Sequence, residues 1–207
     1  MIPAKEALER LKQGNERFAS GHRKRQTAVM MSRREELATE PQEPFAIMLG
    51  CSDSRVPAEI VFDQGLGDLF VIRVAGNIVA PSQVGSVEFA ADRFATKLVV
   101  VMGHTQCGGI TATVDEIIKP DPSHSRYIRS IVDRIRPSVE PLFATDLKGD
   151  RDALVRAAVR ANIRASVDQL RHGSELLEQL IREQGLRVVG AEYSLETGVV
   201  EFFDEAD

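Results

Sequence analysis

Three apolar runs with almost no polar alternation constrain the fold of this chain more than any other feature. They are FAIMLG (45–50), LFVIRVAG (69–76) and KLVVVMG (97–103). Half-exposed strands alternate apolar and polar residues, whereas continuous apolar runs of this length are typical of strands buried on both faces of a parallel sheet. Helical patterns follow the second and third runs, over residues 82–96 and 110–118. The alternation of strand and helix predicts an α/β fold with a mostly parallel central sheet.

The two ends of the chain add further elements to this prediction. Residues 4–20 place apolar side chains on one side of a helix, and a second helix is expected over about 28–39. From 124 to about 183 the pattern is almost wholly helical. The expected interruptions of this helical region are Pro137, Pro141, Gly149 and Gly173. The runs 186–194 and 198–203 predict a hairpin, which adds one antiparallel edge strand to the sheet.

The length and composition suit one soluble domain. The chain has 207 residues, 43% hydrophobic and 28% charged, and no repeat or linker divides it, so we expect a single domain over residues 1–207. Its formal net charge of −5 gives no reason to expect a nucleic-acid surface. No apolar stretch approaches the roughly 18 residues of a membrane span, and the N-terminus lacks the apolar core of a secretory signal. These features predict a cytoplasmic protein without a membrane or nucleic-acid partner.

Polar and potentially metal-binding side chains follow two of the predicted strands at the point where each strand ends. GCSDSR (50–55) follows the first strand and HTQCGG (104–109) follows the third, so both cysteines of the chain stand in matching positions. If these strands are neighbours in a parallel sheet, the two loops emerge together at its carboxyl edge, where α/β proteins place their sites. A cysteine after a strand is by itself most often a small buried residue. The joint pattern favours a functional site.

The side chains of these two loops match the ligands that zinc prefers. Cys51 and Cys107 offer two thiolates, and His104 offers an imidazole. Three protein ligands leave a fourth position open, which is typical of catalytic zinc sites. Asp53 either fills that position or holds whatever else does. The remaining histidines lack such neighbours and are expected on the surface or in packing: His22, His124 and His172.

Two other functions would use similar residues. A cysteine-dependent phosphatase or sulfurtransferase would use Cys51 as nucleophile and Arg55 as anion clamp, but the three residues between them make the loop shorter than a phosphate-binding loop of that kind. A non-catalytic zinc protein would use Asp53 as a fixed fourth ligand. Arg55 argues against it, because an arginine that competes for this aspartate has no use in a static cage.

The motifs CSDSR and HTQCGG, together with DQGLGDLFVIRVAGN (63–77) and GSVEFA (85–90), resemble the β-class carbonic anhydrases. The resemblance is dense over roughly residues 4–118. It implies an enzyme with one zinc ion per chain that interconverts carbon dioxide and water with bicarbonate and a proton, through attack of a zinc-bound hydroxide. It also implies that the zinc ligands are Cys51, His104 and Cys107.

In this resemblance Asp53 and Arg55 correspond to an aspartate–arginine dyad that gates the metal. When the two side chains are paired, the fourth zinc position holds water or hydroxide, and Asp53 orients it. When the pair is broken, Asp53 closes on the metal. Two thiolates cancel the formal charge of the ion, so the site should acidify water less than a three-histidine site, and an alkaline optimum is expected.

The resemblance also implies a substrate pocket. Gln42 would form a hydrogen bond with the substrate, and Gly108 would present a backbone N–H beside a metal ligand. Phe70, Ala75 and Phe89 would form an apolar wall, part of which comes across a dimer interface in the family. Phe89 stands where plant members carry tyrosine, so a hydrogen bond from a ring hydroxyl is not implied there.

A homodimer is the minimal unit of the family and tetramers are common, so a homodimer or homotetramer is expected. In the family the N-terminal helix packs on a partner subunit, which predicts that role for residues 4–20. The alternative is that the apolar stripe of this helix folds back on its own chain.

Some bacterial members carry a second bicarbonate site that stabilises the closed state. Arg73 and Tyr193 match two of its residues, but Met48 stands at the position of the tryptophan, and the chain has no Trp. A methionine cannot donate the hydrogen bond of an indole N–H. We therefore expect an open zinc site at neutral pH, with Asp53 paired to Arg55, and no cooperative inhibition by bicarbonate.

Overall fold

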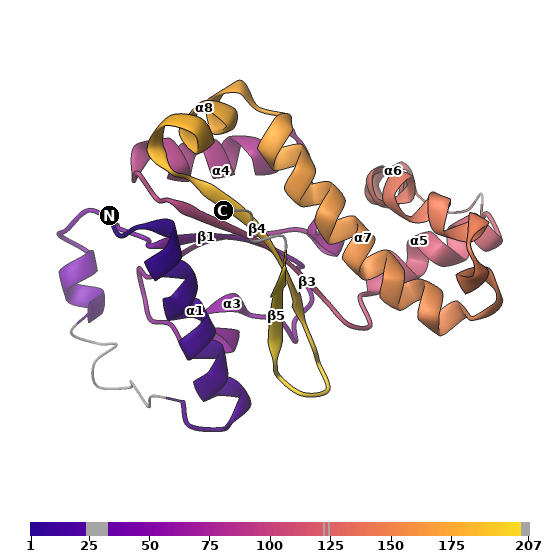
Figure 1. The fold of residues 1–207 in the computed structure, drawn as a ribbon, viewed down its shortest axis with the longest axis horizontal. Coiled ribbons are helices and arrows are strands. Elements are labelled where there is room, and N and C mark those ends of the chain that lie inside the picture. Colours follow the sequence, from indigo (N-terminus) through magenta and orange to yellow (C-terminus); the bar gives the residue numbers. More distant parts are fainter. Residues whose placement is uncertain (24–32, 122, 124, 204–207) are drawn as a thin grey trace.

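A five-stranded sheet lies at the centre of the protein (Figure 1), and its strands have the spatial order β2-β1-β3-β4-β5. The structure is a computed structural model that describes residues 1–23, 33–121, 123 and 125–203. The strands are β1 (Ala46–Gly50), β2 (Leu69–Arg73), β3 (Leu98–His104), β4 (Arg187–Tyr193) and β5 (Val200–Phe203). β2, β1, β3 and β4 are parallel, and β5 is antiparallel to β4. The predicted fold class and the predicted hairpin are confirmed.

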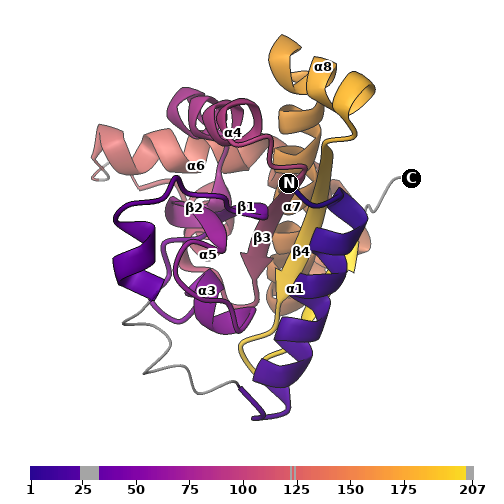
Figure 2. The ribbon, with the colours of Figure 1, turned by 90° about the vertical axis from the view of Figure 1, so that its left-hand side faces the viewer.

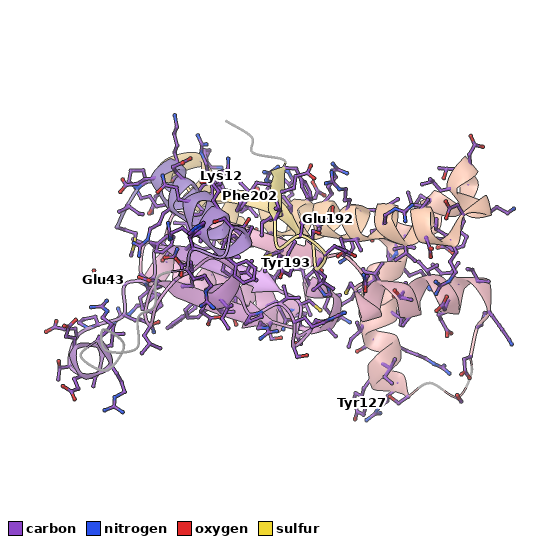
Figure 3. All side chains as sticks on the ribbon, turned by 90° about the horizontal axis from the view of Figure 1, so that it is seen from below. Lys12, Glu43, Tyr127, Glu192, Tyr193 and Phe202 are labelled. Carbon is purple, nitrogen blue, oxygen red and sulfur yellow. The ribbon has the colours of Figure 1, made fainter. Side chains whose placement is uncertain are left out.

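Helices cover both faces of this sheet. They are α1 (Ala4–Ala19), α3 (Ala58–Val61), α4 (Pro81–Arg93), α5 (Gly108–Ile118), α6 (Arg126–Val139), α7 (Arg151–His172) and α8 (Glu175–Gln184). α1 and α3 lie on one face, whereas α4, α7 and α8 lie on the other (Figures 1 and 2). α5 and α6 extend beyond the sheet, and Tyr127 marks the outer end of α6 (Figure 3). Within the part of the chain that the structure describes, no helix combines the length and apolar character needed to cross a membrane.

The long helical region differs from the prediction at one of its four expected breaks. α6 continues past Pro137 to Val139, so the predicted break there is wrong. The proline lies in the last turn, where the chain passes directly into a 3₁₀ segment (Glu140–Ala144) that contains Pro141. Gly149 is the last residue of a second 3₁₀ segment (Asp146–Gly149), and Gly173 follows the last residue of α7, so both lie where an interruption was predicted.

Two predictions fall partly or wholly on parts of the chain that the structure leaves out. Of the helix expected over 28–39, residues 28–32 lie outside the described residues, and residues 33–37 are helical. His124 also lies outside them. His22 and His172 are exposed, and His172 is the last residue of α7.

Strand β2 is not buried on both faces, in contrast to β1 and β3. It is the edge strand of the sheet, so only one side has a neighbouring strand, and its first three residues are half-buried. It also ends at Arg73, three residues before the predicted end. A short 3₁₀ turn, η1 (Ala75–Asn77), follows because Gly76 adopts a left-handed conformation with φ of 69°.

Helix α1 packs against its own chain. Leu8 and Leu11 are buried against the face of the sheet, and a Cβ on Gly14 would lie 1.9 Å from the carbonyl oxygen of Phe62. Figure 3 shows Lys12 of this helix close to Phe202 of β5, with Nζ 5.7 Å from the ring centroid. The apolar stripe of this helix is thus covered by its own chain, which is the second of the two arrangements expected from the sequence. The expected contact of this helix with a partner subunit stays a prediction.

Candidate metal centre

The loop after β1 is held mainly by bonds to its backbone and to one sulfur. Cys51 is buried directly after the strand, and the N–H of Gly76 donates to its Sγ over an N···S distance of 3.4 Å. The guanidinium of Arg73 donates to the carbonyl oxygens of Cys51 (2.9 Å) and Asp53 (2.6 Å). The end of β2 and the turn that follows it therefore position the first loop.

The loop after β3 contains two potential ligands within four residues. His104 is the last residue of the strand, and Cys107 is the cap residue of α5; both are fully buried. Between them, Gln106 has a left-handed φ of 56°, which lets the chain reverse sharply. Glu196 in the β4–β5 turn accepts hydrogen bonds from Thr105 Oγ1 (2.8 Å) and Gln106 Nε2 (2.6 Å).

The two loops meet because β1 and β3 are parallel neighbours in the sheet. Cys51 Sγ lies 3.9 Å from Cys107 Sγ. One ligand atom from each of Cys51, His104 and Cys107 lies within 4.8 Å of the other two. The structure thus brings together the three residues that the strand-end motifs predicted.

The imidazole of His104 is oriented as a metal ligand. Its Nδ1 lies 2.8 Å from the carbonyl oxygen of Thr105, so in the neutral ring Nδ1 donates and Nε2 carries the free electron pair. Within the described residues, Nε2 is buried without a hydrogen-bond partner. A buried polar atom without a partner costs about 1–3 kcal/mol. A metal ion bound at Nε2 accounts for it, and the donor set of two sulfurs and one nitrogen fits zinc.

The two thiols differ in acidity. A hydrogen bond with Cys107 lowers the pKa of Cys51 to about 4, against the opposing effect of burial. The same bond, together with burial, raises the pKa of Cys107 far above its usual range. The second thiolate is unfavourable because two like charges would lie 3.9 Å apart. A divalent cation between the sulfurs removes that penalty.

Burial and neighbouring charge act in opposite directions on the third ligand. Burial lowers the pKa of His104, whereas the Cys51 thiolate and the Thr105 carbonyl raise it by more, so that the net shift is upward. The centre therefore attracts positive charge.

Asp53 and Arg55 form a bidentate ion pair beside this centre. Arg55 Nε lies 2.9 Å from Asp53 Oδ1, and Arg55 Nη2 lies 2.7 Å from Asp53 Oδ2. These hydrogen bonds hold the pKa of Asp53 well below its usual range. Asp53 Oδ2 also lies 3.7 Å from His104 Nε2, so the carboxylate reaches the metal centre while it is bound to the arginine.

The residues expected to line a substrate pocket lie in different parts of the structure. Phe70 and Phe89 lie together at the edge of the sheet, with ring centroids 6.3 Å apart, and Phe94 completes an aromatic cluster that the sequence did not predict. Gly108 is exposed at the start of α5, and Ala75 begins the 3₁₀ turn beside Cys51. Gln42 is exposed before β1 and has no hydrogen bond within the described residues.

The three residues compared with a second bicarbonate site lie in two settings, the core under α1 and the end of β2. Met48 is buried in the core under α1, and Tyr193 is buried in the same cluster, where its ring lies 6.3 Å from that of Phe18. The guanidinium of Arg73 is bound to the two carbonyl oxygens of the first loop.

An α/β sheet with a buried cysteine–histidine–cysteine group at its carboxyl edge, next to a carboxylate–guanidinium pair, defines a metalloenzyme architecture. The profile of the carbonic anhydrase family matches residues 46–200. The chain belongs to this family, and its structural neighbours are of the β class. Enzymes of this class use zinc, and the three grouped donors offer the sulfur and nitrogen atoms that this ion prefers.

Both sequence and structure relate the chain to known members. It is 38% identical to carbonic anhydrase 2 of Mycobacterium tuberculosis over 194 residues, which covers 93% of this chain and 89% of that protein. It is 36% identical to a carbonic anhydrase of Mycolicibacterium smegmatis, over 94% of this chain and 91% of that one. The fold is similar to a β-carbonic anhydrase of Aspergillus fumigatus, with a TM-score of 0.75, 27% identity, and coverage of 87% and 86% of the two chains. For the Coccomyxa enzyme the TM-score is 0.69 at 25% identity, with 85% of each chain covered.

Proposed function

We propose that this protein catalyses the reversible hydration of carbon dioxide to bicarbonate and a proton at the Cys51–His104–Cys107 centre, with Asp53 and Arg55 as its orienting and gating pair. The observation that carries the proposal is the convergence of three buried donors on one point, with an unpartnered His104 Nε2 and a carboxylate 3.7 Å from it. Zinc held there would supply hydroxide near neutral pH, because the bound ion lowers the pKa of water.

The two side chains of the pair have separable tasks. Asp53 accepts a hydrogen bond from the reacting oxygen and so aims its electron pair at the substrate carbon. Arg55 holds the Asp53 carboxylate through two parallel hydrogen bonds, and its Nη2 also approaches the carbonyl oxygen of Gln106 at 3.5 Å. Arg55 thereby links the two ligand loops and keeps Asp53 in its orienting position.

The substrate pocket is proposed to use Gln42 and the backbone N–H of Gly108 as polar contacts. Phe70, Ala75 and Phe89 would form its apolar wall. Support comes from the aromatic cluster, because Phe89 remains 53% exposed at the edge strand although it packs against Phe70. Such a surface suits a second copy of the chain, so a homodimer or homotetramer is proposed as the working form.

We also propose a cytoplasmic location and a single domain over residues 1–207. Both cysteines are free, and zinc binding requires them to remain reduced, as in the cytoplasm. All described strands belong to one sheet, whose two faces each carry one hydrophobic cluster.

The open state is proposed for neutral pH, without cooperative inhibition by bicarbonate. The Asp53–Arg55 bonds support it, and so does the engagement of Arg73 with backbone carbonyls. A crystal grown near pH 7 with Asp53 on the metal would contradict it. A steep cooperative loss of activity on addition of bicarbonate would contradict it as well.

Stopped-flow hydration of carbon dioxide by purified, zinc-loaded protein tests the proposed function. Turnover well above the uncatalysed rate is expected, with an alkaline optimum. A protein that binds one zinc ion per chain and shows no hydration would instead be a non-catalytic zinc protein in which Asp53 is a fixed ligand.

A further inference from the structure

The turn that donates to the Cys51 sulfur contains an unfavourable backbone conformation and an unpaired polar group. Gly76 and Asn77 are both left-handed, with φ of 69° and 43°, and a non-glycine residue in that region costs about 1 kcal/mol. Asn77 Nδ2 is also buried without a hydrogen-bond partner within the described residues. A turn with these features persists only when the surrounding structure holds it.

Helix α7 supplies that support from a distant part of the sequence. Asn162 Nδ2 donates to the carbonyl oxygen of Gly76 over 2.8 Å, and Ser166 Oγ donates to the carbonyl oxygen of Asn77 over 3.2 Å. Asn162 and Ser166 are only 2% and 4% exposed, so water does not compete for these bonds. Both lie on the buried face of a helix whose other buried residues are mostly apolar.

The start of α5 confines the same turn. A Cβ on Gly109 would lie 3.2 Å from both Cα and N of Gly76, which is closer than side chains normally approach. Gly76 is thus packed against the first turn of the helix that Cys107 caps. Its N–H points at Cys51 Sγ, and the Asn162 bond sets the orientation of the adjoining peptide group.

We propose that Asn162, assisted by Ser166, is a positioning residue of the metal centre: it fixes the 75–77 turn so that the Gly76 N–H donates to the Cys51 sulfur. A hydrogen bond to a ligating thiolate withdraws charge from the sulfur and fixes its direction, and outer partners of this kind change metal affinity or activity by about 10- to 100-fold. The inference rests on the proposed zinc site and adds to it a residue that contacts neither metal nor substrate.

The test compares Asn162→Leu with wild type in two measurements that do not depend on turnover. Zinc affinity is measured by competition with a chelator at constant pH, and the sulfur-to-metal charge-transfer bands are recorded for the cobalt-substituted protein. We expect Asn162→Leu to bind zinc about 10- to 100-fold more weakly and to shift those bands. Ser166→Ala should change both in the same direction by less, and it serves as the test if Asn162→Leu does not fold.

Leu170→Ala is the matched control, because Leu170 is buried on the same helix but its side chain forms no polar bond with the turn. It should lower the melting temperature and leave the charge-transfer bands unchanged. The proposal is overturned if folded Asn162→Leu or Ser166→Ala loses stability while zinc affinity and spectrum match those of wild type. Failure of the wild-type protein to bind cobalt or zinc would instead refute the proposed site itself.

Discussion

The two loops that carry the metal ligands are supported in different ways. The first, after β1, is held by the Arg73 guanidinium and by a turn that buried side chains of α7 brace. The second, after β3, is bonded to the exposed carboxylate of Glu196, and its Thr105 also donates from its N–H to the carbonyl oxygen of Tyr193 and accepts from the N–H of Leu195 at Oγ1. Water competes for exposed hydrogen bonds and not for buried ones, so equal numbers of bonds do not give equal rigidity. The first loop therefore depends in part on buried bonds from α7, whereas the second is bonded to the end of β4 and to the turn that follows it.

Loss of a zinc ligand should have the largest effect on zinc content and activity, and the effect should be the same for either loop. Cys51→Ser and Cys107→Ser each remove one thiolate from a three-donor site, so both should lose most of the zinc and all detectable hydration activity. Metal analysis of the folded variants measures this directly. Stoichiometric zinc in either variant would show that the ligand assignment is wrong.

Asp53→Ala should separate chemistry from metal binding within the first loop. The variant keeps all three donors, so zinc should remain, whereas kcat should fall by about 10²- to 10³-fold because the reacting oxygen loses its acceptor. Ser52→Ala, at the exposed neighbouring residue, is the control and should keep its activity. Turnover equal to wild type in Asp53→Ala would exclude this carboxylate from the mechanism.

Arg73→Leu tests the support of the first loop without changing a ligand. It removes two bonds to carbonyl oxygens, of Cys51 and Asp53, and should lower kcat/KM by about tenfold while zinc content is kept. Arg73→Lys, which keeps the charge and one donor group, should recover part of the loss. An unchanged kcat/KM in Arg73→Leu would mean that the loop does not need this support.

Glu196→Ala should have the smallest effect, because the bonds that it removes from the second loop are exposed. We expect a change in kcat/KM of less than about threefold and full zinc content. A loss of zinc comparable to that of Cys107→Ser would show that the second loop depends on these exposed bonds, contrary to this expectation.

The same residue gives a pH test. Hydrogen bonds from Thr105 and Gln106 lower the pKa of Glu196 from 4.5 to about 2. A lowered pKa stabilises the fold above pH 4.5, and that contribution is lost as the pH falls from 4.5 to 2. Melting temperatures of wild type and Glu196→Ala should therefore converge over this range, and a constant difference down to pH 2 would contradict the assignment.

The apolar runs predicted the fold class and the strand-end motifs predicted the three converging donors, because both depend on local sequence pattern and on one rule about parallel sheets. They did not predict that β2 is an edge strand, since an apolar run does not reveal how many neighbours it has. Pro137 was expected to break a helix that in fact passes through it. These differences arise from tertiary packing, which local propensity does not contain.

The residues that support the two loops from distant parts of the sequence were also not predicted, and the reason is a different one. Asn162 and Gly76 are 86 residues apart, and Glu196 is 90 residues from Gln106. A signal was nevertheless present in α7, where Asn162 and Ser166 occupy helical positions otherwise filled by Leu, Ala, Val and Ile. A polar residue on a buried face needs a hydrogen-bond partner, and this requirement points to a specific contact elsewhere in the chain.

The strand order described above also determines when the centre can form. β3, which carries His104, pairs on one side with β1 and on the other with β4, which begins at residue 187. Asn15 in α1 bonds Gly198 and Val200 near the opposite end of the chain. Pairings so distant in sequence close slowly and only after the last strands have been synthesised. We therefore expect the complete centre to form late, after β4 has paired with β3, and a chain that stalls before residue 187 to expose both thiols because it lacks this strand.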